Sequence, residues 1–166
     1  MNKTYLILVP LGIAILGVIL WVAKPDANKQ TTAGATFSLD SLEIEEKSYD
    51  FGNISMAQGT VSHEFTIKNV GKEPLKLGKM YTSCMCTTVS LLLNGEKKGP
   101  FGMPGHTPLP KVNKEIQPGG SAQIEVIFDP AAHGPAGVGI IERVAYVEGS
   151  SLAEPLEFGI KAFVTP

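Results

Sequence analysis

Two cysteines separated by one residue are the clearest chemical feature of this 166-residue chain. On an extended segment, Cys84 and Cys86 would point to the same face, because side chains alternate along a strand. Their Cα atoms would then lie roughly 6.5–7 Å apart, at the outer limit for a relaxed disulfide. The same spacing lets two thiolates converge on one ion at about 2.3 Å each. We therefore predict that Cys84 and Cys86 bind a metal ion.

A Pro/Gly-rich segment offers two further ligands. In Met103-Pro-Gly-His106, the Pro-Gly pair favours the central positions of a type II turn, which brings the first and fourth residues within about 7 Å. Thiolate, thioether and imidazole together suit a soft ion, Cu(I) before Zn(II). The sequence thus predicts a copper site made by Cys84, Cys86, Met103 and His106.

Other interpretations of these residues stay open. A free cysteine can be a small buried hydrophobe, and Met103 can fill a gap under its loop. Thiol redox chemistry is a weaker alternative, because C-x-C lacks the helix N-terminus that lowers a C-x-x-C thiol pKa. Met85 would face away from the cysteines, and His133 is a loop histidine of lower priority. His63 shares the apolar face of its strand, which predicts a core histidine with a satisfied hydrogen bond.

Composition and motifs exclude several function classes. The sequence contains no G-x-S-x-G, H-E-x-x-H or P-loop signature. With 14 Lys and Arg against 16 Asp and Glu, the net charge is −2 and there is no basic excess for nucleic acid. We expect a protein that is not an enzyme and has no nucleic-acid partner.

Period-2 alternation of apolar residues dominates the chain from residue 38 onward, as in residues 61–68, 124–129 and 156–164. Seven or so short strands separated by turn signals predict an all-β, immunoglobulin-like antiparallel β-sandwich. Residues 95–114 hold four prolines and four glycines, and we expect a long loop there that contains no strand. The predicted core residues are Phe65, Ile67, Ile124, Val126, Phe128, Phe158 and Ile160.

The N-terminal segment predicts a transmembrane helix. Residues 5–23 are 19 residues without a charge, which at about 1.5 Å per residue just cross a hydrocarbon core of roughly 30 Å. Tyr5 and Trp21 lie near its ends, where aromatic belts form. No small-x-small cleavage site stands close behind it, so we expect an uncleaved anchor rather than a signal peptide. The predicted organisation is an anchor at 1–24, a flexible linker at 25–37 and a sandwich domain at 38–166.

These features combine into one main hypothesis and one alternative. A short N-terminus on a single signal-anchor favours export of the downstream domain, so we expect a single-pass membrane protein whose domain is extracytoplasmic, at the cell surface or in the periplasm. The main hypothesis is a membrane-anchored binder of copper. The alternative is a non-catalytic interaction module that recognises an unidentified protein partner through an exposed strand edge.

Five short motifs occur in this order along the chain: Phe51-Gly-Asn-Ile54, Asn69-Val-Gly-Lys-Glu-Pro-Leu75, Ser83-Cys-Met-Cys-Thr87, Ile116-Gln-Pro-Gly119 and Ile124-x-Val-x-Phe-Asp-Pro130. They resemble, in order, those of an exported bacterial immunoglobulin-like family catalogued as domain of unknown function fifteen-seventy-three, akin to chaperone-like and ciliary sandwich domains. The resemblance covers residues 49–164 and implies a seven-stranded sandwich and an extracytoplasmic location, but no activity. The chain departs from the family in having Met85 where glycine is typical, and in a longer loop around Met103 and His106.

The predicted anchor gives a first test. Because the apolar span is long enough to cross a bilayer and lacks a nearby cleavage site, we expect it to remain attached to the mature protein. Mass spectrometry of the membrane fraction should recover a peptide that contains Trp21. A soluble mature form that begins after Ala35 would contradict this prediction.

Overall fold

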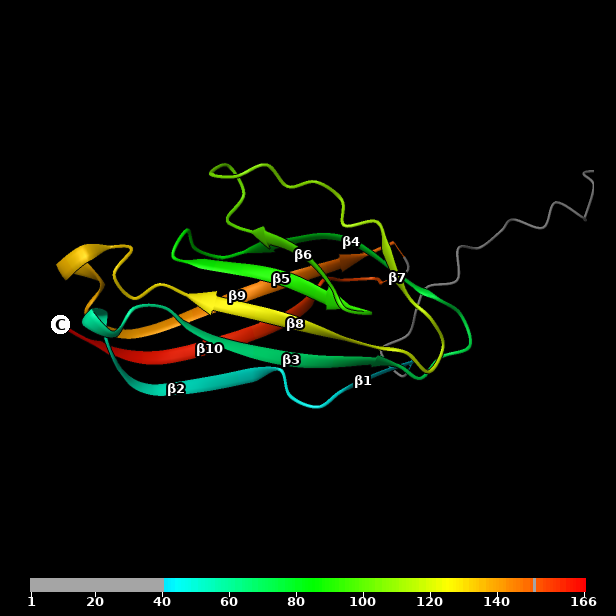
Figure 1. Cartoon of the computed structure of the whole chain (residues 1–166), viewed down its shortest axis with the longest axis horizontal. Coiled ribbons are helices and arrows are strands. Elements are labelled where there is room, and N and C mark those ends of the chain that lie inside the picture. The colour runs from blue at the N-terminus through cyan, green and yellow to red at the C-terminus, as the bar shows by residue number, and fades with distance from the viewer. Residues whose placement is uncertain (1–40, 151) are drawn as a thin grey trace, which may run out of the picture. The chain divides into compact units, whose positions relative to one another are not determined.

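The computed structural model describes residues 41–150 and 152–166, which form two five-stranded β-sheets (Figure 1). The first sheet has the order β1-β3-β8-β5-β6, and the second has the order β2-β10-β9-β4-β7. The first sheet consists of β1 (Leu42–Ile44), β3 (Val61–Asn69), β8 (Ser121–Phe128), β5 (Thr87–Leu93) and β6 (Glu96–Phe101). The second consists of β2 (Ser48–Ser55), β10 (Leu156–Thr165), β9 (Gly139–Gly149), β4 (Leu75–Thr82) and β7 (Lys114–Ile116).

The predicted all-β sandwich is confirmed, with two differences. β2 pairs with β10 in parallel, whereas the other ladders between the described strands are antiparallel. The sheets also contain more strands than the seven or so expected. β1 and β7 have three residues each, which is too short for an alternating pattern to stand out in the sequence.

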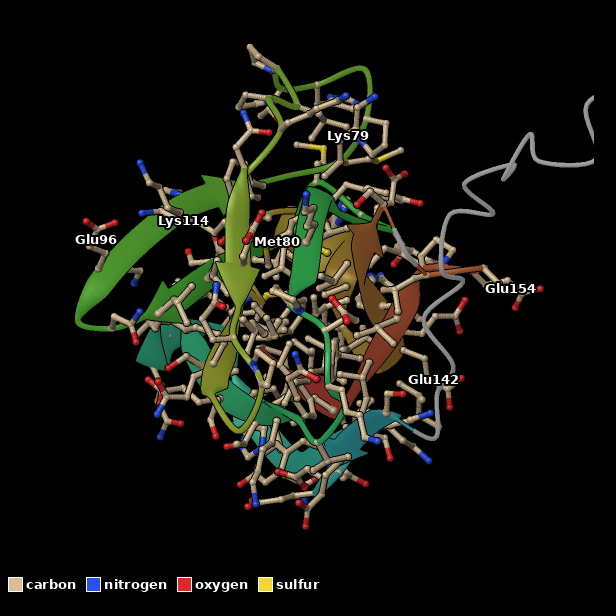
Figure 2. All side chains as sticks on the ribbon, turned by 90° about the vertical axis from the view of Figure 1, so that its right-hand side faces the viewer. Lys79, Met80, Glu96, Lys114, Glu142 and Glu154 are labelled. Atoms are coloured by element: carbon tan, nitrogen blue, oxygen red, sulfur yellow. The ribbon has the colours of Figure 1, made fainter. Side chains whose placement is uncertain are left out.

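The core lies between the two sheets and is built from the inward side of each alternating strand. Phe65 on β3 and Phe158 on β10 are fully buried, and their ring centroids lie 5.1 Å apart. Met80 on β4 is also fully buried and lies inside the sandwich (Figure 2). All seven predicted core residues are at most 2% exposed, which confirms the alternation: Phe65, Ile67, Ile124, Val126, Phe128, Phe158 and Ile160.

The expectation that residues 95–114 contain no strand is wrong, because β6 occupies Glu96–Phe101. β6 is an edge strand. Proline has no N–H to donate to a neighbouring strand, so Pro100 is tolerated at an edge, where one side of the strand is unpaired. Gly99 has a φ of +129°, and a Cβ there would lie 2.8 Å from the Ser90 hydroxyl oxygen, so glycine allows the two strands to approach. The proline and glycine that argued against a strand therefore fit its position at the edge.

His63 is placed largely as predicted. Its side chain is 20% exposed and hydrogen-bonds to the carboxylate of Glu46. The ring also stacks on Tyr49 of β2, with 3.7 Å between the ring centroids. His63 thus has a satisfied polar contact at the side of the core.

The predicted anchor at residues 1–24 and linker at residues 25–37 lie outside the described residues, and the domain boundaries stay a prediction. Within residues 41–150 and 152–166, no helix has the length and apolar character needed to cross a membrane.

Two phenylalanines on β10 give a matched test of the packing. Phe158 is fully buried and Phe163 is 45% exposed. We expect Phe158→Ala to lower the free energy of unfolding by about 3–5 kcal/mol, because it removes a ring from the core and leaves a cavity. Phe163→Ala should cost far less. Urea unfolding followed by circular dichroism measures both values, and equal losses would contradict the assignment of faces.

Candidate functional site

The two cysteines lie in a tight turn, residues 83–86, between β4 and β5. The Thr87 N–H donates to the Cys84 carbonyl oxygen at 3.2 Å, which closes a β-turn. The expectation of an extended segment at Cys84 and Cys86 is therefore wrong. The reason is topological, because β4 belongs to the second sheet and β5 to the first, so the chain must change sheets within this short turn.

This turn is fixed to its neighbours by hydrogen bonds. The Ser83 N–H donates to the Val144 carbonyl oxygen, and the Val144 N–H donates to the Ser83 hydroxyl oxygen, both at 2.9 Å. The Asp129 N–H donates to the Cys86 carbonyl oxygen at 2.9 Å. The turn is thus held by β9 and by the first residue after β8.

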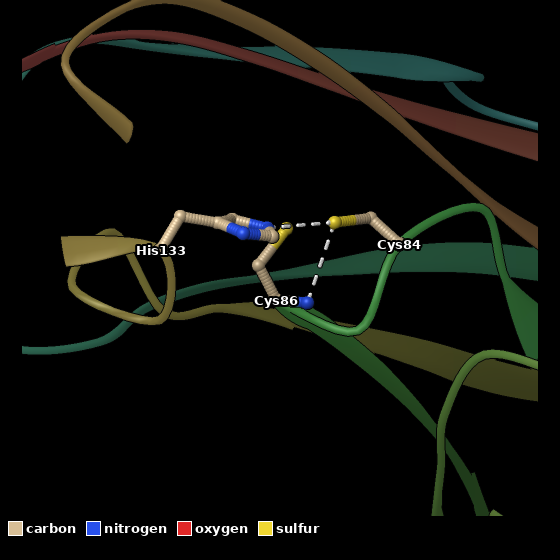
Figure 3. Close-up of side chains that lie close together, drawn as sticks. All are labelled: Cys84, Cys86 and His133. Atoms are coloured by element: carbon tan, nitrogen blue, oxygen red, sulfur yellow. Dashed lines mark hydrogen bonds between the residues drawn. The ribbon is translucent and has the colours of Figure 1, made fainter. Parts of the chain in front are cut away.

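His133 comes from the loop between β8 and β9. Asp129 begins this loop, and its carboxylate accepts a hydrogen bond from the Ala131 N–H at 2.9 Å. The Gly134 N–H then donates to the Ala131 carbonyl oxygen at 2.8 Å, just before the short helix η3 (Gly134–Gly137). These two local turns place the His133 ring against the cysteine turn (Figure 3).

The three side chains meet at distances close to those of a metal site. The Cys84 Sγ lies 3.2 Å from the His133 Nε2 and accepts a hydrogen bond from the Cys86 N–H at 3.4 Å (Figure 3). The two sulfurs and a ring nitrogen of His133 all lie within 4.8 Å of one another. Two sulfurs that bind one ion at about 2.3 Å each can be at most about 4.6 Å apart. Only a small adjustment would therefore bring all three onto one ion.

Exposure increases across the group. Cys86 is 3% exposed, Cys84 is half-buried and His133 is exposed. Both cysteines are free thiols. A ligand from solvent would therefore meet His133 and Cys84 first, with Cys86 at the bottom of the site.

Arg143 on β9 contributes a positive charge to the buried side of the group. Its Nε donates to the Cys86 Sγ at 3.3 Å, and its Nη1 donates to the Glu142 carbonyl oxygen at 2.8 Å. Because β9 belongs to the second sheet, this side chain reaches across to the turn that leads into β5 of the first. No sequence pattern marked Arg143 as part of the site.

The two thiols differ in acidity. Burial alone would raise the pKa of Cys84, but hydrogen bonds from the Cys86 side chain and N–H, the hydrogen bond with His133 and the charge of Arg143 lower that pKa to about 7. Burial and the neighbouring Cys84 raise the pKa of Cys86, against the opposing hydrogen bond from Arg143. Cys84 is therefore the thiol that ionises first.

The turn predicted at Met103-Pro-Gly-His106 is confirmed. The His106 N–H donates to the Met103 carbonyl oxygen at 3.2 Å, and Gly105 has a φ of +85°, as a type II turn requires. The loop begins beside the site, because the Thr82 N–H donates to the Gly102 carbonyl oxygen at 3.3 Å. His106 is exposed and is not a member of the Cys84, Cys86 and His133 group. Ligation by Met103 and His106 stays a prediction.

His133 has a central place in the group, although its sequence context indicated only a loop histidine of lower priority. β5 and β8 are antiparallel, and Thr87 pairs with Phe128. A turn that precedes β5 must therefore lie beside the loop that comes after β8. Knowledge that β5 pairs with β8 would have revealed His133 as a neighbour of the cysteines. Hydrophobic periodicity does not show which distant strands pair with each other.

Comparison with known families agrees with the resemblance. Residues 42–99 match the model of a family described as Protein of unknown function (DUF1573). The matched region includes Cys84 and Cys86, and it ends before Met103, His106, His133 and Arg143. No curated protein matches the sequence.

Three solved structures resemble the chain at low sequence identity. A protein of unknown function from Porphyromonas gingivalis W83 has a TM-score of 0.53 and 21% identity, covering 74% of this chain and 46% of that one. The secreted serine protease VesC from Vibrio cholerae gives 0.49 and 13%, covering 77% and 25%. An ASH/PapD-like domain of human CEP192 gives 0.44 and 15%, covering 75% and 85%. The chain thus spans less than half the length of the first two, and its likeness to the Porphyromonas gingivalis protein is one of fold alone.

The acidity of Cys84 predicts a pH profile for its reactivity. Because the thiolate is the nucleophile, alkylation of Cys84 by iodoacetamide should rise with pH around a midpoint of about 7, while Cys86 should react only at higher pH. His133→Ala removes a hydrogen bond that favours the thiolate, so the midpoint should move up. Peptide mass spectrometry of the quenched reactions measures both cysteines. A Cys84 midpoint at the ordinary thiol value of about 8.5 would contradict the prediction.

Proposed function

We propose that this chain, which carries a DUF1573 region, binds copper as Cu(I) through Cys84, Cys86 and His133, and presents the ion from a membrane-anchored domain outside the cytoplasm. The observation that carries the proposal is the approach of the three donor atoms to within 4.8 Å of one another. We infer that the protein binds the metal for storage, delivery or sensing, and not for catalysis.

The donor set favours a soft ion. Two thiolates and one imidazole are ligands that Cu(I) accepts, and soft sulfur donors select it over harder ions. Three donors also suit an ion of low coordination number, whereas structural zinc sites are almost always four-coordinate. Within the described residues the group has these three His or Cys members and no carboxylate. The group thus lacks the fourth protein ligand of a closed structural zinc site.

The proposed location rests on the sequence. The uncharged segment at residues 5–23 and the polar linker at residues 25–37 would hold the sandwich at a membrane surface. The copper proposal does not depend on this anchor, because all three ligands belong to the sandwich.

Met103 and His106 remain candidate ligands from the loop that starts beside Thr82. Their turn has the predicted geometry, and a thioether or imidazole from it would add to the affinity for Cu(I). The proposal takes His133 as the nitrogen ligand, since His133 already contacts Cys84. Separate substitutions of His133 and His106 distinguish a site that uses His133 from one that uses the Met103 and His106 loop.

Thiol redox chemistry is the second candidate, and the lowered pKa of Cys84 is the observation that favours it. The Cys84 thiolate would attack one oxygen of hydrogen peroxide and break its O–O bond, which oxidises the sulfur by two electrons and leaves a sulfenic acid and hydroxide. Attack by Cys86 would then form a Cys84–Cys86 disulfide and release the sulfenic oxygen as water. A loss of mass equal to two hydrogen atoms after peroxide treatment, with no change in copper affinity on His133→Ala, would favour this candidate.

Recognition of a protein partner through a strand edge has less support. The edge strand β6 carries Lys97, Lys98 and Pro100, and such residues discourage pairing with another strand. The edge strand β2 is interrupted at Gly52, whose φ is +68° and whose N–H is bound by the Asp50 carboxylate. The remaining edges, β1 and β7, are three residues long. An interaction module would use another surface.

A competition titration against a Cu(I) chelator tests the metal site. The variant Cys84→Ser with Cys86→Ser should lose binding, because it removes both sulfurs. His133→Ala should weaken binding by at least about tenfold, since even losing the outer partner of a ligand typically costs 10–100-fold. Affinity should also fall as pH is lowered, because protons compete for the thiolates.

His106→Ala is the matched control, since it removes an exposed histidine outside the group. Equal affinity in wild type and the double serine variant would overturn the proposal. A loss with His106→Ala as large as that with His133→Ala would support the loop ligands predicted from the sequence.

A further inference from the structure

The charge around the thiols bears on which ion the site accepts. Two ionised cysteines carry two negative charges, and a histidine that binds a metal is neutral. Arg143 adds one positive charge, which arginine keeps at all accessible pH values. The protein groups alone therefore sum to a single negative charge when both thiols are ionised.

We propose that Arg143 selects monovalent over divalent soft ions at the Cys84, Cys86 and His133 site. The inference rests on the proposed metal-binding function. A monovalent ion makes the assembly of two thiolates, Arg143 and the ion neutral, whereas a divalent ion leaves one positive charge. Cys86 is 3% exposed, and an unbalanced charge is costly in such a setting.

The geometry keeps this charge close to the ion. The Arg143 Nε lies 3.3 Å from the Cys86 Sγ, and a second hydrogen bond from Nη1 to the Glu142 carbonyl oxygen at 2.8 Å orients the guanidinium. An ion bound to Cys86 would thus be bonded directly to the sulfur that accepts the hydrogen bond from Arg143. No Asp or Glu side chain among the described residues forms an ion pair with Arg143, so its charge is free to act on the site.

Arginine also keeps Cys86 in place as a ligand. The N–H that donates to the sulfur can remain when the thiolate binds a metal, because sulfur has further lone pairs. Such a hydrogen bond orients a ligand and tunes its basicity, as outer partners of metal ligands do. Arg143 is therefore a positioning residue as well as a source of charge, and the test must separate the two roles.

Ag(I) and Cd(II) are suitable probes because both are soft and do not change oxidation state under the assay conditions. Their affinities for the full-length protein are measured by competition titration, and the ratio of the two dissociation constants is compared among variants. Effects of a variant on thiol ionisation act on both ions and largely cancel in this ratio, whereas a nearby charge acts more strongly on the divalent ion.

Arg143→Gln removes the charge, while Arg143→Lys retains it without the planar donor. We expect Arg143→Gln to shift the affinity ratio toward Cd(II) by at least about tenfold, given the strength of a unit charge at such short range. Arg143→Lys should restore most of the preference for Ag(I), even if both ions bind more weakly. A purely positioning role would weaken both ions in both variants and leave the ratio unchanged.

Lys68→Gln is the control for loss of one positive charge. Lys68 is an exposed residue of β3 that pairs with Glu43 on β1, at the end of β3 opposite to the one that pairs with Phe128. Its substitution should leave the ratio unchanged. An unchanged ratio in Arg143→Gln, with Ag(I) still bound through the cysteines, would overturn this inference alone. Failure of wild type to bind either ion, or equal binding by the double serine variant, would overturn the proposed function.

Discussion

Face-to-face packing of the two sheets is the constraint on which the rest of the structure depends. Phe65 and Phe158, one from each sheet, meet in the core with ring centroids 5.1 Å apart. Packed sheets lie about 10 Å apart, so the short turn between β4 and β5 must cross this gap. That crossing puts both cysteines at one end of the sandwich, where Arg143 of the opposite sheet reaches the Cys86 sulfur.

The site is asymmetric because the turn passes from the surface to the core. Cys84 is half-buried and has hydrogen-bond donors around its sulfur, whereas Cys86 faces the interior and Arg143. One thiol is therefore easily ionised and accessible, and the other is shielded. Metal binding and thiol oxidation both begin at an accessible thiolate, which explains why the same geometry supports two chemistries and why affinity measurements, rather than geometry, separate them.

Sequence alternation predicted the fold because burial on one face leaves a period-2 pattern. Phe158 and Ile160 lie in the core as that pattern requires, and Pro104-Gly105 forms the expected turn because its conformational preference is local. The pattern did not reveal β6, since its Pro100 is tolerated only at an edge, which depends on pairing. Arg143 was missed as a site residue, and His133 was given low priority, for a related reason. Both are brought to the cysteines by contacts between strands distant in sequence.

The parallel pairing of β2 with β10 has a mechanical consequence. Ser48 lies beside Gly159 and Ser55 lies beside Thr165, so the leading end of β2 and the trailing end of β10 are at opposite ends of one ladder. Tension applied between the two ends of the domain, once β1 has detached, would load these hydrogen bonds in shear, all at the same time. If two paired strands were instead pulled apart from the same end of their ladder, their hydrogen bonds would break one after another. A sandwich tethered at one end and pulled at the other would thus resist extension through its β2–β10 ladder.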